Sequence, residues 1–215
     1  MRQLRSGIVA SLLVPWCWTA LLAQLQLPHD AEPIDTLPIR YRPVANLLEL
    51  RVGALHSIEV APAFAYVGGQ RFILGGSADA EQHLFAVADS SRAVQRLYWI
   101  QIEERLPTQA GSYDYSADSA VSIQGFSLAA NFRTYTTPPA AGSDRARAFA
   151  LVAGQRYQMP EGATRVRLVY LPDATARREI MIVYLEATPA GPADVGSRAA
   201  QLSRAGQGLI LRARP

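Results

Sequence analysis

The sequence predicts an α+β domain in which a mostly antiparallel, curved sheet of about five to seven strands packs against one or two helices. Three observations predict this class. Short runs rich in aromatic and β-branched residues follow one another between glycine and polar turn signals, as antiparallel strands do. One run near residue 150 has apolar residues three and four apart, as in an amphipathic helix. Strands come in groups rather than in strict alternation with helices, which favours antiparallel pairing.

The chain begins with the pattern of a secretory signal peptide. Arg2 and Arg5 precede an almost wholly apolar run over residues 8–23, after which the sequence turns polar. A membrane-spanning helix needs about 20 apolar residues, whereas this run is shorter and is broken by Pro15. We therefore expect residues 1–23 to be a cleaved signal peptide. The alternative is an uncleaved membrane anchor, which the short and interrupted apolar run disfavours. The protein is then exported to the periplasm or the extracellular space.

Cys17, the only cysteine, lies inside this apolar run and is not preceded by the small residues of a lipidation site. Cleavage after Ala23 would leave a mature chain without thiols. Such a chain has no intramolecular disulfide, no thiol nucleophile and no zinc site with thiolate ligands. We find neither a phosphate-binding Gly-Lys-Ser element nor the glycine-flanked serine of a nucleophile elbow. We therefore predict no cofactor and no metal.

The basic residues do not indicate a nucleic-acid partner. All 21 of them are arginine, and the sequence pI is about 9.2. Loss of Arg2 and Arg5 with the leader would leave 19 arginines against 18 acids, so the net charge would fall from +3 to +1. A phosphate-binding surface needs a concentrated basic face, and these arginines are scattered. We expect no nucleic-acid binding.

The expected domain covers residues 46–187 and follows a polar leader at residues 24–45. Residues 46–60 alternate loosely and fit either a strand or a short helix. The clearest strands form an antiparallel meander, bounded by glycine and polar turn residues, at residues 70–75, 81–88 and 94–104.

The second half of the domain adds further strands and a helix. Residues 121–135 read as one or two strands, with Gly125 at a bulge or bend. Ser143 caps a helix that ends near Gln155. The strands at 164–171 and 178–186 follow, and the second is so continuously apolar that we place it in the middle of the sheet. Residues 188–215 read as a linker and C-terminal tail with a short helix at 197–207.

The candidate binding site combines residues of two neighbouring strands with a loop. The two-residue period of a strand places Asp79, Glu81 and His83 on one face. A three-residue turn would put Glu81 opposite Gln101 and His83 opposite Trp99, whereas a turn of even length would put His83 opposite Tyr98. Tyrosine residues of the loop at 113–115 can line a pocket mouth. The candidate ligand-binding residues are Glu81, His83, Trp99, Gln101, Glu103 and Tyr113.

Three functions are compatible with these features. We expect a non-catalytic exported domain that binds a small, partly apolar ligand or an envelope protein, because no catalytic set is recognisable. Whether the chain is an enzyme stays open, and the first alternative is a hydrolase or isomerase with Glu81 and His83 as acid and base, joined by Glu103. The second is an envelope interaction module without a pocket, whose contacts come from residues 188–215. A lone imidazole favours a structural role for His83.

Overall fold

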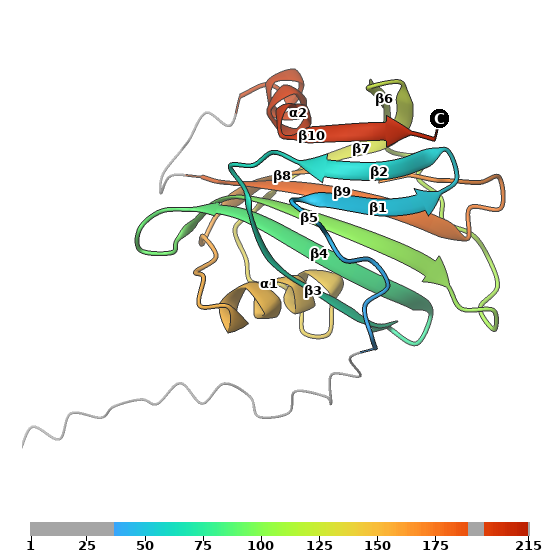
Figure 1. Ribbon diagram of the computed structural model, residues 1–215, viewed down its shortest axis with the longest axis horizontal. Helices are drawn as coiled ribbons and strands as arrows, with labels where there is room; N and C mark the ends of the chain where they lie inside the picture. Colours follow the sequence, from blue (N-terminus) through green and yellow to red (C-terminus); the bar gives the residue numbers. More distant parts are fainter. Residues whose placement is uncertain (1–36, 189–195, 215) are drawn as a thin grey trace, which may run out of the picture. The chain divides into compact units, whose positions relative to one another are not determined.

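The computed structural model describes residues 37–188 and 196–214, so the predicted signal peptide and its cleavage site lie outside the described residues. Ten strands in these two ranges form two antiparallel sheets, and two helices accompany them. Helix α1 (Asp144–Gly154) lies on one face of the larger sheet, and the smaller sheet lies on the other (Figure 1). The fold is dominated by its sheets, so the expected α+β class describes it only loosely. No helix in the described ranges is long and apolar enough to cross a bilayer.

The larger sheet contains seven described strands in the order β3-β4-β5-β9-β8-β7-β6. The predicted meander is confirmed as β3-β4-β5, and the strand expected in the middle is β9, which lies between β5 and β8 with residues 179–185 buried. The bounds are β3 (Ala65–Leu74), β4 (Ala78–Ala88), β5 (Val94–Arg105), β6 (Ser119–Ile123), β7 (Phe126–Tyr135), β8 (Ala163–Tyr170) and β9 (Arg178–Ala187).

Residues 119–135 form a hairpin of two strands. Gln124 and Gly125 join β6 to β7 with φ values of 51° and 85°, as the two central residues of a type I′ turn require. Gly125 therefore lies in the turn itself. The predicted helix is also confirmed, because the Ser143 side chain accepts a hydrogen bond from the backbone N–H of Ala146 and caps α1.

The smaller sheet contains β1 (Leu47–Val52), β2 (Leu55–Val60) and β10 (Leu209–Ala213), with β2 in the middle. The sequence pattern of residues 46–60 fits either a strand or a short helix, and in the structure these residues form a hairpin of two strands. The predicted C-terminal helix is α2 (Arg198–Gln207), which leads directly into β10. Leu209 and Leu211 of β10 are buried in the core between the two sheets.

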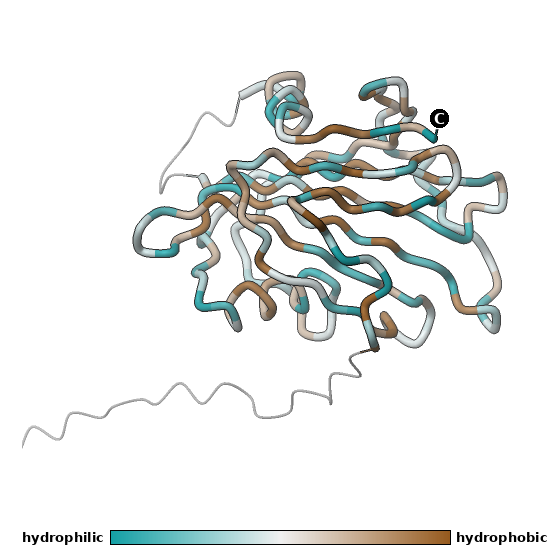
Figure 2. Tube along the Cα trace, viewed as in Figure 1, coloured by the Kyte–Doolittle hydropathy of each residue, from teal (hydrophilic) through white to brown (hydrophobic). Residues whose placement is uncertain are grey.

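Apolar side chains cover both faces of the middle of the larger sheet. On one face, Tyr98 and Ile182 pack against Ile58 of the smaller sheet's core. On the other, Trp99 belongs to the cluster that includes Val152 of α1. Figure 2 shows hydrophobic residues along the strands of both sheets and hydrophilic residues in many of the connecting loops.

Candidate functional site

The candidate residues of β4 and β5 lie on opposite faces of the larger sheet. Glu81 pairs with Ile102 and His83 with Ile100, on the face that meets the smaller sheet. Trp99, Gln101 and Glu103 point to the face that carries α1. Both predicted registers were wrong, because the register shifts between Val87 and Ala88 near the turn. A one-residue shift moves every side chain of the paired strand to the other face.

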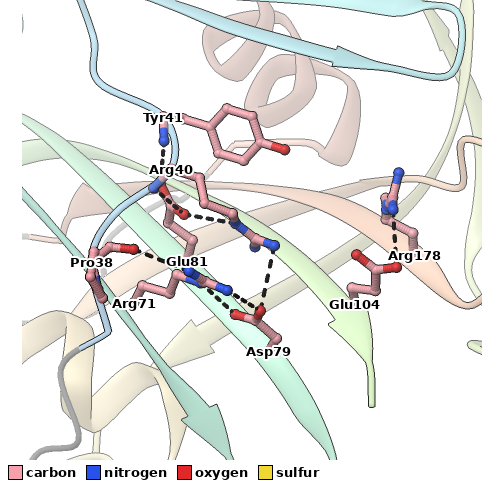
Figure 3. Close-up of polar contacts among 8 residues, drawn as sticks. All are labelled: Pro38, Arg40, Tyr41, Arg71, Asp79, Glu81, Glu104 and Arg178. Atoms are coloured by element: carbon pink, nitrogen blue, oxygen red, sulfur yellow. Dashed lines mark hydrogen bonds and ion pairs between the residues drawn. The ribbon is translucent and has the colours of Figure 1, made fainter. Parts of the chain in front are cut away.

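Glu81 attaches the segment before β1 to the larger sheet. The backbone N–H of Arg40 donates to both carboxylate oxygens at 2.9 and 3.0 Å, and that of Tyr41 donates to Oε1 at 2.8 Å (Figure 3). Arg40 Nε adds a contact of 3.2 Å. On the same face, Asp79 binds Arg71 and Arg40. Because Glu81 is fully buried, these donors replace the water that its carboxylate loses.

His83 joins Glu81 to a tyrosine. Its Nε2 lies 3.0 Å from Glu81 Oε1, and its Nδ1 lies 3.1 Å from the hydroxyl of Tyr66. The carboxylate only accepts, so Nε2 carries a proton, and in the neutral imidazole Nδ1 then accepts from the tyrosine hydroxyl. Burial acts to raise the pKa of Glu81, but hydrogen bonds from His83 and from the backbone N–H groups of Tyr41 and Arg40 hold this pKa below its ordinary value. A catalytic set that also includes Glu103 does not form, because Glu103 is on the other face.

The remaining four candidate residues form one hydrogen-bonded chain on the face that carries α1. Trp99 Nε1 donates to Gln101 Oε1 at 3.1 Å, and Gln101 Nε2 donates to Glu103 Oε2 at 2.7 Å. The hydroxyl of Tyr113 donates to Glu103 Oε1 at 2.7 Å. The predicted loop tyrosine therefore meets the predicted strand residues, although Glu81 and His83 lie on the far side of the sheet.

Glu103 has a second carboxyl group beside it, that of Glu179 on β9. The two residues pair across the strands with 7 % and 3 % exposure, and the hydroxyl of Tyr115 donates to Glu179. Burial raises the pKa of both groups, and the charge of Glu103 contributes to raising that of Glu179 to about 7. Nothing in the sequence marks Glu179 as a site residue, since it stands at the start of an apolar strand. The spacing of Tyr113 and Tyr115 was the available signal, because both hydroxyls reach this carboxyl pair.

The two tyrosines line a cavity of about 550 Å³ at the margin of the larger sheet. Strands β7 and β8 stop pairing at Ala129 and Val169, beyond which β7 stays with β6 and β8 stays with β9. The cavity lies in the resulting gap, which we call the fork and which is formed by residues 127–129 and 169–171. Residues 113–116 and 118 of the preceding loop complete its lining, together with Ala120.

Comparison of the chain with protein-family models, with curated proteins and with solved structures found no match. Within the described ranges, no group of three or more histidine, cysteine, aspartate or glutamate side chains is placed to hold a metal ion.

Proposed function

We propose that this chain is a non-catalytic binding domain whose small, partly apolar ligand occupies the cavity at the fork. The observation that carries the proposal is the fixed position of the lining tyrosines. The hydroxyls of Tyr113 and Tyr115 are held by the buried carboxyl groups of Glu103 and Glu179. Rings that are held before the ligand arrives lose little conformational entropy on binding. The volume is also within the range of small-molecule sites, about 300–1,000 Å³.

The lining supports a ligand with both apolar and polar parts. Leu128, Tyr170 and Leu171 also line the cavity and add apolar surface. Asp114 and Asp118 contribute carboxylates, of which Asp118 is already bound by Arg167 and Asn131. The signal-peptide pattern supports a ligand that is met in the periplasm or outside the cell.

Filling the cavity should abolish binding without unfolding the domain. Ser127 is exposed on β7 and lines the cavity, so Ser127→Trp places an indole where the ligand would lie. The measurement is a screen of small-molecule fragments by ¹H–¹⁵N NMR. Fragments that bind the wild type at the fork should shift the backbone amide signals of residues 113–118. The same fragments should leave these signals unchanged in the variant.

The matched control is Ser119→Trp. Ser119 is also exposed on this hairpin, but it pairs with Ala130 and therefore points to the opposite face from Ser127. Binding should survive in this control. If no fragment perturbs residues 113–118, or if hits map only to another cavity, such as that of about 420 Å³ lined by Tyr135, Phe149 and Met159, the proposal is wrong.

A hydrolase or isomerase is the second candidate, and the chain of Tyr66, His83 and Glu81 favours it. Glu81 would orient the imidazole, and Nδ1 would take the proton of the tyrosine hydroxyl. This function requires that the wild type cleave members of a p-nitrophenyl ester panel or isomerise a defined substrate. It also requires that His83→Asn lower the rate of that reaction at least ~100-fold. No turnover, or equal turnover in the variant, rejects it.

An interaction module built on residues 188–215 has less support, because Ala205 and Leu209 are buried in the core between the sheets.

A further inference from the structure

The fork leaves main-chain hydrogen-bonding groups of two strands without a partner strand. In the β6–β7 hairpin, a two-residue turn joins Ile123 to Phe126, so these residues exchange hydrogen bonds. Along a strand, the main-chain N–H and C=O groups of successive residues point alternately to the two neighbouring strands. The main chain of Leu128 therefore points to β6, whereas those of Ser127 and Ala129 point to β8.

On the other side of the fork the same alternation applies to β8. Ala129 pairs with Val169, so the main chain of Val169 points to β7 and that of Leu171, two residues further on, has the same direction. The next pair of this ladder would be Ser127 with Leu171, and the described pairing of β7 with β8 stops before it. Both residues line the cavity, and Ser127 is exposed. The cavity thus has open strand edges on two sides.

We propose that the ligand of this cavity is a short, extended and positively charged peptide, bound through the main chains of Ser127 and Leu171. This inference rests on the proposed function. An extended peptide presents N–H and C=O groups to both sides and can complete an interrupted ladder, as in strand-addition complexes. The rings of Tyr113 and Tyr115 supply apolar contact beside it.

The charge of the lining sets the preferred side chain of the peptide. The charged residues that line the described cavity are Asp114 and Asp118. Asp118 is paired with Arg167, whereas Asp114 is exposed and accepts from the backbone N–H of Ser116. Its carboxylate favours a lysine or arginine side chain. The rings of Tyr113 and Tyr115 add no further attraction for a cation, because Arg105 and Arg167 already lie over them at 4.8 and 5.0 Å from the ring centroids.

The test uses capped tripeptides, acetyl-Ala-X-Ala-amide with X as lysine, arginine, leucine or glutamate, titrated to millimolar concentration against the full chain. We expect the lysine and arginine peptides to shift the ¹H–¹⁵N signals of Ser127 and Leu171. Methylation of the central peptide nitrogen removes one main-chain donor and should weaken binding about fivefold. The leucine peptide should bind more weakly, and the glutamate peptide most weakly.

Asp114→Asn tests the charge. It should reduce the preference for the lysine over the glutamate peptide by at least ~threefold, as expected for one exposed ion pair. Asp173→Asn is its control, because Asp173 accepts from the backbone N–H two residues ahead in the same way but does not line the cavity. An equal effect of both variants overturns the charge assignment.

The outcomes separate this inference from the proposed function. If fragments bind at the fork but no peptide does, or if nitrogen methylation leaves the affinity unchanged, the ligand is not recognised as a peptide strand and only the inference fails. If neither fragments nor peptides perturb the residues of the fork, both proposals fail.

Discussion

Glu81→Gln should lower the free energy of unfolding by about 3 kcal/mol at pH 7. The carboxylate is fully buried and receives hydrogen bonds from two backbone N–H groups, from Arg40 Nε and from His83. The amide of glutamine keeps one acceptor but turns an NH₂ group toward some of these donors. It also leaves the Arg40 guanidinium without one of its two carboxylate partners. Urea denaturation of both proteins, followed by tryptophan fluorescence, measures the difference.

Glu104→Gln is the control for this effect. Glu104 lies on the same face of the sheet as Glu81, but its ion pair with Arg178 is partly exposed, with side-chain exposures of 43 % and 39 %. Such a pair contributes about 0–1 kcal/mol, so this variant should unfold almost as the wild type does. A Glu81→Gln variant that is as stable as Glu104→Gln would show that the attachment of residues 40 and 41 contributes nothing to stability.

Glu179→Gln should make the protein more stable than the wild type at pH 8 but not at pH 4. Burial, followed by the charge of Glu103, raises the pKa of Glu179 from 4.5 to about 7, so the folded protein favours the protonated carboxyl group. Protonated Glu179 contributes its full share to the free energy of unfolding below pH 4.5, and this contribution is lost as the pH rises through 7. The loss is at most on the order of 3 kcal/mol. Glutamine does not titrate and can still accept from Tyr115.

Three other groups around Glu179 also influence its pKa. Asp144 on α1 also raises the pKa of Glu179, whereas Tyr115 on the loop and Arg167 on β8 lower it. The measurement is the urea midpoint of both proteins between pH 4 and pH 8. The midpoint difference should grow with pH and should be absent in a Glu104→Gln variant. Parallel curves for Glu179→Gln and the wild type would mean that the pKa of Glu179 is the same in the folded and the unfolded protein.

Elements with strong local patterns were predictable. The N-cap at Ser143 and the apolar spacing behind it determine α1, and the continuous apolar run at 180–185 predicted that β9 is central. The second sheet was not predictable in this way. Its middle strand, β2, is held by β10 from the other end of the chain, and local patterning carries no information about a pairing over that separation.

The site shows the same division between local and long-range information. The two-residue period correctly placed Asp79, Glu81 and His83 on one face. Their partner residues were not predictable, because the bulge near Val87 exchanges the faces of β5 without any distinctive residue to mark it. The backbone N–H donors of Glu81 come from a segment about 40 residues away, which only the folded chain brings near.

The segment that Glu81 holds also has a consequence for self-association. Strand β3 is an outer strand of the larger sheet, and Leu37 forms a β-bridge to Arg71 on its free side. An uncovered outer strand is a template for intermolecular pairing. Cleavage of the chain after residue 41 by a protease would therefore uncover β3 at Arg71 and remove the backbone donors of a buried carboxylate. The few residues that precede the first strand thus also cover part of an edge at which another chain could pair.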